Sequence, residues 1–113
     1  MGGPPITVPA VTPAEAQRLL AGQPADTLLL DVREPDELAL ARVPGALAIP
    51  MHELPLRLAE VPRERHVLVL CHHGTRSWHV AQALLAHGWP RVANVSGGID
   101  RWAREVDPSV GSY

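Results

Sequence analysis

A single cysteine follows an apolar stretch of the sequence, and an arginine stands five positions after it. Cys71 comes directly after the run HVLVL at residues 66–70, while Gly74, Arg76 and Ser77 follow it. A thiolate is a strong nucleophile, and both the amino terminus of a helix and a nearby arginine favour the thiolate over the thiol. We therefore interpret Cys71 as a nucleophile and Arg76 as the cation that supports it.

The spacing around Cys71 also predicts a cradle for an anion. A buried strand over residues 66–70 would end at the cysteine, and an amphipathic helix over residues 77–86 would begin shortly after it. The short loop between them would bend around the sulfur, so that backbone N–H groups of the loop and of the helix start converge on one point. Such a nest would stabilise a persulfide anion, Cys–S–S⁻, as well as a thiolate.

Strands and helices are predicted to alternate along the whole chain. Continuous apolar runs of strand length are typical of strands that are buried on both faces of a parallel sheet. Thr12, Pro13 and Glu15 form a helix start with a capping box. We expect strands at residues 8–11, 27–32, 47–49, 66–70 and 91–95, and helices at 13–22, 35–41, 52–60, 77–86 and 98–106. The pattern predicts an α/β domain with a mainly parallel central sheet and helices on both faces.

Two places lie beyond the carboxyl ends of predicted strands, where such sheets bind ligands. One begins at Cys71, and the other contains Asp31 and Arg33. Asp31 and Arg33 could form a catalytic pair, but we favour the interpretation that they brace the active loop by charge-assisted hydrogen bonds. Gly97 and Gly98 are typical of a tight turn that caps the last helix rather than of a phosphate loop.

Composition limits the function classes. The chain has 113 residues, which predicts one domain, and its net charge of -2 gives no indication of a nucleic-acid partner. All ten basic residues are arginine, so lysine chemistry is excluded. The lone cysteine excludes an internal disulfide and a zinc site with several thiolates. We also expect no metal at Cys71, His72 and His73, because adjacent side chains point in different directions and we expect no carboxylate or second thiolate nearby.

No apolar run is long enough to span a membrane, and residues 1–5 lack the basic and apolar stretches of a signal peptide. We therefore expect a cytoplasmic protein that does not associate with membranes. The sequence leaves the oligomeric state open.

Four segments resemble, in order and spacing, the motifs of rhodanese-like domains. They are LDVRE at residues 30–34, VPGA through IP at 43–50, CHHGTRS at 71–77 and SGGIDRW at 96–102. The resemblance runs from about residue 6 to residue 108 and implies one three-layer rhodanese-like domain over residues 1–113. It also implies sulfur transfer without a cofactor: Cys71 would take the outer sulfur of thiosulfate or a persulfide and pass it to cyanide, a thiol or a protein.

The resemblance suggests roles for individual residues. Cys71 and Arg76 would be catalytic, and Asp31 and Arg33 would brace the loop. Substrate binding would fall to the remaining loop residues, which are His72, His73, Gly74, Thr75 and Ser77. Two positions depart from the family pattern. Arg42 stands where the family commonly has histidine, and His72 stands where a basic residue is frequent; a partly charged His72 near pH 7 could still attract an anionic donor.

Three alternative functions are compatible with this pattern. The first is a non-catalytic scaffold or regulatory domain, although inactive relatives usually lack the cysteine. The second is a small phosphatase or arsenate reductase of similar fold. The active loops of those enzymes resemble the longer pattern C-x5-R, whereas the loop from Cys71 to Arg76 has the pattern C-x4-R. The third follows from residues 102–108, which resemble the end of rhodanese domains fused to activating enzymes of molybdopterin or thiamine synthesis. The partner would then be a small sulfur-carrier protein.

Overall fold

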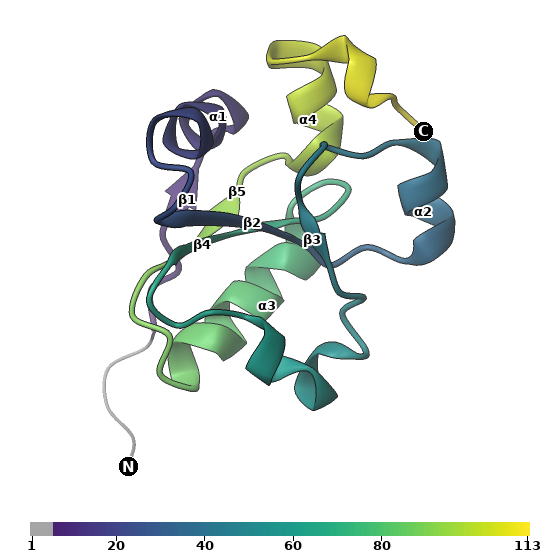
Figure 1. The fold of residues 1–113 in the computed structure, drawn as a ribbon. Coiled ribbons are helices and arrows are strands. Elements are labelled where there is room, and N and C mark those ends of the chain that lie inside the picture. Colours follow the sequence, from purple (N-terminus) through teal and green to yellow (C-terminus); the bar gives the residue numbers. More distant parts are fainter. Residues whose placement is uncertain (1–5) are drawn as a thin grey trace.

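A five-stranded parallel sheet forms the centre of the computed structural model, which describes residues 6–113 (Figure 1). Its strands lie in the order β1-β5-β4-β2-β3. They are β1 (Ala10–Val11), β2 (Thr27–Asp31), β3 (Leu47–Ala48), β4 (His66–Leu70) and β5 (Val92–Val95). Because β4 is the middle strand and pairs with both β2 and β5, the residue that follows it lies at the centre of the carboxyl edge of the sheet.

Helices cover both faces of the sheet, as the sequence predicts. On one face lies α3 (Thr75–Ala86), and on the other lie α1 (Pro13–Gly22) and α4 (Gly98–Glu105); α2 (Pro35–Leu40) lies beyond the end of β2 (Figure 1). The alternation of side chains along β4 builds both cores. Val67 and Val69 pack in the α3 layer, whereas Leu68 and Leu70 pack in the layer of α1 and α4. The domain is therefore a three-layer α/β structure.

Most predicted elements form within one or two residues of their expected limits. The capping box of α1 is confirmed: the Glu15 N–H donates to Thr12 Oγ1 over 3.1 Å, and the Thr12 N–H donates to Glu15 Oε1 over 2.8 Å. Helix α3 begins at Thr75 rather than at residue 77. Gly74 precedes it with φ +107°, a left-handed conformation that glycine adopts without strain and that allows the helix to start earlier.

The predicted helix over residues 52–60 is wrong. This segment forms two short 3₁₀ helices, Leu54–Leu56 and Leu58–Glu60. Pro55 has no N–H to donate, and its ring obstructs a continuous α-helix through this segment. The segment nevertheless buries Leu54 in the core beneath α3.

The end of the chain folds back onto the carboxyl edge of the sheet. Pro108–Val110 form another 3₁₀ helix, Val110 is buried, and its carbonyl accepts the Arg42 N–H over 2.9 Å. The Arg42 side chain itself is exposed. In the described part of the chain, no helix is long and apolar enough to cross a bilayer. The prediction about a signal peptide concerns residues 1–5, which lie outside the described residues.

Candidate active site

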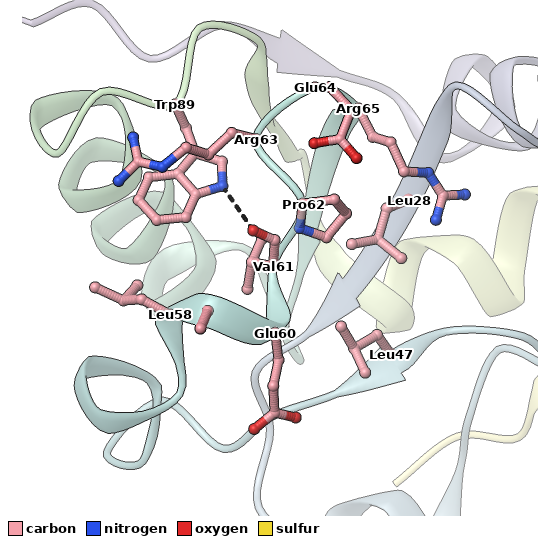
Figure 2. A pocket seen from close by; sticks show the side chains of 11 residues that line it. Leu28, Leu47, Leu58, Glu60, Val61, Pro62, Arg63, Glu64, Arg65 and Trp89 are labelled. Carbon is pink, nitrogen blue, oxygen red and sulfur yellow. Dashed lines mark hydrogen bonds between the residues drawn. The ribbon is translucent and has the colours of Figure 1, made fainter.

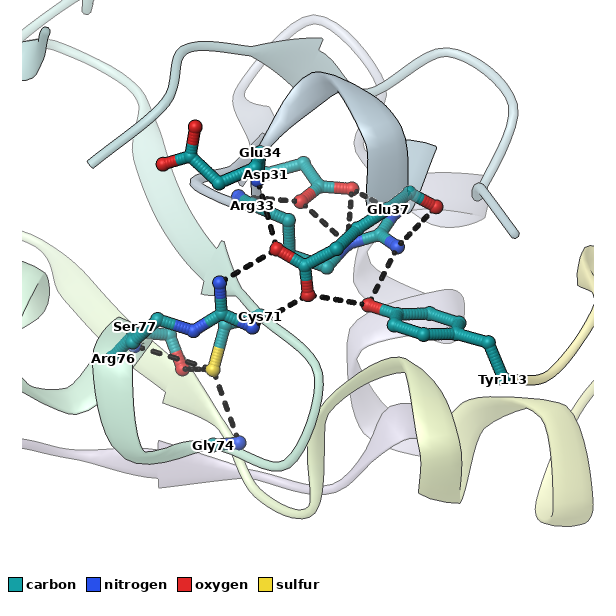
Figure 3. A network of polar contacts seen from close by, with 9 residues as sticks. All are labelled: Asp31, Arg33, Glu34, Glu37, Cys71, Gly74, Arg76, Ser77 and Tyr113. Atoms are coloured by element: carbon teal, nitrogen blue, oxygen red, sulfur yellow. Dashed lines mark hydrogen bonds and ion pairs between the residues drawn. The ribbon is translucent and has the colours of Figure 1, made fainter. Parts of the chain in front are cut away.

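Cys71 lies at the carboxyl end of the central strand, where the chain turns sharply into α3 (Figure 3). Its side chain is 1% exposed and adjoins the core beneath α3. The turn depends on Gly74, because a Cβ there would lie 3.2 Å from the Gly97 nitrogen and the φ of +107° is unfavourable for other residues. The sequence therefore brings the cysteine, the loop and the helix start together as predicted.

Polar groups surround the Cys71 sulfur on the loop side. The backbone N–H of Gly74 donates to Sγ over 3.1 Å, and that of Ser77 lies 3.4 Å from Sγ. The Ser77 hydroxyl lies 3.2 Å from the same atom. Two amides thus converge on the sulfur, one from the loop and one from the first turn of α3. A buried cysteine that only fills space needs no such donors, and donors placed in this way can stabilise negative charge on the sulfur.

The start of α4 fixes the active loop by backbone hydrogen bonds to its carbonyl groups. The N–H of Ile99 donates to the Cys71 carbonyl over 2.9 Å, and the N–H of Asp100 donates to the His72 carbonyl over 3.1 Å. A side chain at Gly98 would collide with both of these carbonyls. Gly97 and Gly98 therefore form the tight helix cap that the sequence predicts, and this cap fixes the backbone of the loop.

Arg76 is paired with a carboxylate from another helix. Its guanidinium donates to both oxygens of Glu37 in α2, over 2.8 and 2.7 Å. This ion pair lowers the pKa of Glu37 to about 2, with the Arg76 hydrogen bond as the largest cause, and the Glu37 hydrogen bond raises the pKa of Arg76. The sequence predicts Arg76 as a cation near the sulfur. In the structure the hydrogen bonds of its side chain go to Glu37, and an electrostatic interaction with Cys71 contributes to the raised pKa of Arg76.

Asp31 and Arg33 form a buried ion pair at the end of β2. Arg33 is 0% exposed, and its Nη2 lies 2.6 Å from Asp31 Oδ2. The remaining guanidinium nitrogen, Nη1, donates to the Glu37 carbonyl over 3.3 Å. The pair thus positions α2, which holds Arg76 through Glu37. Bracing of the loop is therefore indirect, through α2, rather than by direct contact with the loop.

Tyr113 joins this network, and no sequence pattern predicts that it does. Its hydroxyl donates to Glu37 Oε1 over 2.9 Å and accepts from Arg33 Nη1 over 3.0 Å (Figure 3). Its ring stacks on His72 at a centroid distance of 3.9 Å. No motif or periodicity singles out a residue so far along the chain from the loop that it contacts.

His72 is enclosed between two other rings. His73 stacks on it at 3.8 Å, opposite Tyr113. Burial, followed by the effect of neighbouring His73, lowers the pKa of His72. A lowered pKa reduces the positive charge on His72 near pH 7, which argues against a role for that charge in attracting an anionic donor. His73 and Thr75 are exposed at the loop surface, and their roles in substrate binding remain predictions.

A carboxylate does lie near the two histidines, contrary to the sequence argument. One donor atom from each of His72, His73 and Asp100 lies within 4.8 Å of the others. The two imidazole planes differ by only 28°, so their in-plane lone pairs run nearly parallel instead of converging on one ion. We accordingly retain the prediction that no metal binds here.

A pocket lies away from this loop, at the opposite end of the parallel strands. It has a volume of about 980 Å³ and lies near the amino ends of β2 and β4 (Figure 2). Trp89 forms one side, donating its indole N–H to the Val61 carbonyl over 3.3 Å beneath the guanidinium of Arg63. Its lining contains no cysteine, serine or threonine, and it lies opposite the edge where parallel sheets bind ligands, so we assign the chemistry to Cys71.

Comparisons with known proteins match this geometry. Residues 12–105 match the family described as rhodanese-like domain. The chain is 44% identical over 85 residues to a sulfurtransferase of Allochromatium vinosum, which covers 75% of this chain and 79% of that protein. It is 32% identical over 102 residues to the thiosulfate sulfurtransferase GlpE of Glaesserella parasuis, covering 90% and 93% of the two chains. A rhodanese-like domain protein from Staphylococcus aureus superposes with a TM-score of 0.78 at 31% identity, covering 88% of this chain and 95% of that one.

Proposed function

The chain belongs to the family of rhodanese-like domains, and we propose that it transfers a sulfane sulfur that Cys71 carries as a persulfide. Similarity to sulfurtransferases supports sulfurtransferase activity in general. The observation that carries the specific proposal is the Cys71 sulfur at the end of β4, with the Gly74 and Ser77 amides directed at it over 3.1 and 3.4 Å.

A second sulfur would find further donors in the same place. The first N–H groups of an α-helix have no carbonyl partner within the helix, and α3 begins at Thr75, four residues after the nucleophile. The amides of Thr75 and Arg76 are therefore available to an anion bound at the helix start. These two amides and the charge of Arg76 support stabilisation of a terminal persulfide sulfur.

The proposed reaction has two balanced steps. The Cys71 thiolate attacks the outer sulfur of thiosulfate, a new S–S bond forms, and the old S–S bond breaks with its electron pair leaving on sulfite. The resulting Cys71 persulfide anion is then attacked at its outer sulfur by cyanide or a thiolate. The bond to Sγ breaks, its electron pair returns to Cys71, and thiocyanate or a new persulfide leaves. No net oxidant or reductant is required.

The donor, the acceptor and the location are further parts of the proposal. Thiosulfate is favoured as donor by the similarity to GlpE, and a small sulfur-carrier protein is a second possible acceptor because of the resemblance at residues 102–108. The short C-x4-R loop favours sulfur over a phosphoryl group, and the intact cysteine favours a catalytic role over a scaffold. A cytoplasmic location stays a prediction.

Steady-state transfer from thiosulfate to cyanide tests the proposal. Wild-type protein should form thiocyanate, and Cys71→Ser should not, because an alcohol forms no stable persulfide. Circular dichroism of the variant checks that the fold is retained. Equal rates for the variant and the wild type would overturn the assignment of Cys71.

A further inference from the structure

Asn94 lies on β5, the strand next to the central strand β4, and its side-chain hydrogen bonds go to residues around the nucleophile rather than to Cys71 itself. It belongs to β5 and is 7% exposed, and its side chain reaches two parts of the active loop. Its amide Nδ2 donates to the Gly74 carbonyl over 3.0 Å. Its Oδ1 lies 2.5 Å from the hydroxyl oxygen of Ser77, which is itself completely buried.

These two contacts fix the direction of the hydrogen bonds. The Gly74 carbonyl can only accept, so the amide nitrogen of Asn94 must face it and the amide oxygen must face Ser77. The oxygen of an amide likewise only accepts, so the Ser77 hydroxyl has to donate its single hydrogen to Asn94. In the contact of 3.2 Å between Ser77 Oγ and Cys71 Sγ, the serine oxygen is then the acceptor and the thiol S–H is the donor.

We infer that Asn94 is a positioning residue for the nucleophile: it holds the Ser77 hydroxyl as an acceptor toward Cys71 and so favours the resting thiol over the thiolate. When Cys71 ionises, it has no hydrogen left to give, and the lone pairs of Ser77 Oγ face the negative sulfur. The hydroxyl can turn toward the sulfur only by leaving the buried Asn94 oxygen without a partner. The backbone amides of Gly74 and Ser77 and the charge of Arg76 then stabilise the anion without help from the hydroxyl.

This arrangement has a consequence for reactivity. A hydroxyl beside a catalytic thiolate would ordinarily be expected to donate to it and increase its acidity. Here the amide of Asn94 competes for the same hydrogen and reverses that effect. The free thiol is thereby less prone to oxidation and alkylation than the loop amides and Arg76 would otherwise make it.

A change in the ionisation of Cys71 can be assigned to Ser77 only if the hydrogen bonds of the other charged and titratable groups around the loop are unchanged. They are Asp31 at the end of β2 and Arg33 after it, Glu37 in α2, His72 and His73 in the loop, Arg76 in α3, Asp100 in α4 and Tyr113 at the end of the chain. Their hydrogen bonds do not involve Ser77 or Asn94, whose partners are the Cys71 sulfur and the Gly74 carbonyl.

The inference is tested by the direction in which one substitution shifts the pH midpoint of Cys71 alkylation. Because the chain has one cysteine, the pH midpoint of its alkylation by iodoacetamide reports ionisation of Cys71 alone. Ser77→Ala removes the acceptor of the thiol hydrogen, so its midpoint should fall by roughly half to one pH unit. A midpoint that rises or stays the same would overturn the inference, because it would show that the hydroxyl donates to the thiolate or does not act on it.

A double-mutant cycle then tests the part played by Asn94. Asn94→Leu should also lower the midpoint, because the freed hydroxyl can donate to the thiolate, whereas adding Asn94→Leu to Ser77→Ala should change nothing further. A similar shift from Asn94→Leu in both backgrounds would contradict the inference and indicate loosening of the loop. The inference concerns the thiol of the proposed function, but this test requires no sulfur transfer. The inference about Asn94 can therefore fail while the proposed sulfur transfer stands, and the proposed sulfur transfer can fail while the inference stands.

Discussion

Arg76 and Glu37 are joined by two hydrogen bonds of 2.8 and 2.7 Å that connect the first turn of α3 to α2. The Glu37 side chain is 16% exposed and that of Arg76 is 37% exposed, so the pair lies at the edge of the active loop. Glu37 also accepts from Tyr113. A network that begins with a buried ion pair at Asp31 and Arg33 thus ends at the arginine beside the nucleophile.

The ion pair predicts a pH dependence of stability. The pKa of Glu37 falls from its ordinary value of 4.5 to about 2 in the folded protein, chiefly because of Arg76. A lowered carboxyl pKa stabilises the fold above the unfolded value, and this stabilisation is lost as pH falls from about 4.5 to 2. The melting temperature should therefore decrease over this range, and Glu37→Gln should reduce the slope.

A matched control separates this effect from general acid denaturation. Glu105→Gln removes a carboxylate that also pairs with an arginine, Arg101, over 2.7 Å on the exposed side of α4. This variant should keep the slope of the wild type. Equal slopes for Glu37→Gln and wild type would show that the ion pair is not coupled to folding.

Arg76→Ala should weaken the use of thiosulfate. The variant removes a positive charge near the sulfur and leaves Glu37 without its partner, so kcat/KM for thiosulfate should fall roughly 10²-fold. The alkylation midpoint of Cys71 should move to higher pH. Arg57→Ala is the control, because Arg57 also pairs with carboxylates but lies between β3 and β4. Identical alkylation profiles for Arg76→Ala and wild type would exclude any action of Arg76 on the thiol.

Tyr113→Phe should destabilise the fold modestly. The change keeps the ring that stacks on His72 but removes the hydroxyl shared by Arg33 and Glu37. Loss of this bridging hydroxyl should lower the free energy of unfolding by about 1 kcal/mol. Urea titration of both proteins measures the difference, and an unchanged midpoint would mean that water replaces the hydroxyl without cost.

Loop length predicts substrate selectivity. Transfer of a phosphoryl group requires donors around three equatorial oxygens, whereas the loop from Cys71 to Arg76 is one residue shorter than C-x5-R. Turnover of p-nitrophenyl phosphate should be negligible beside thiosulfate sulfurtransferase activity in the same preparation. Insertion of one glycine after Gly74 should reduce sulfur transfer. Phosphatase activity that exceeds sulfur transfer and disappears in Cys71→Ser would contradict the proposed function but not the fold.

The features predictable from the sequence are those that depend on local pattern. The run HVLVL gives β4 with the limits expected, and Thr12 with Glu15 gives the start of α1. Gly74 identifies the turn because a left-handed conformation strongly favours glycine. Such patterns involve residues a few positions apart, and they are sufficient to predict the layers, the loop and the position of Cys71 at the end of β4.

The features that could not be predicted depend on contacts between distant parts of the chain. Glu37 and Arg76 are 39 positions apart, and Arg33 and Tyr113 are 80 apart. Asn94 is a polar residue inside a short apolar strand, which indicates a buried partner but not its identity. The pairing of strands brings these residues together, and no spacing in the sequence encodes it.

The mass of the intact protein after incubation with thiosulfate tests the central claim most directly. Transfer of one sulfur to Cys71 should add ~32 Da, an increase that cyanide then removes with release of thiocyanate. Cys71→Ser should gain no mass under the same conditions, and labelling the outer sulfur of thiosulfate should place the label in thiocyanate. A wild-type protein that forms thiocyanate without ever gaining this mass, or a serine variant that gains it, would contradict a Cys71 persulfide as the carrier.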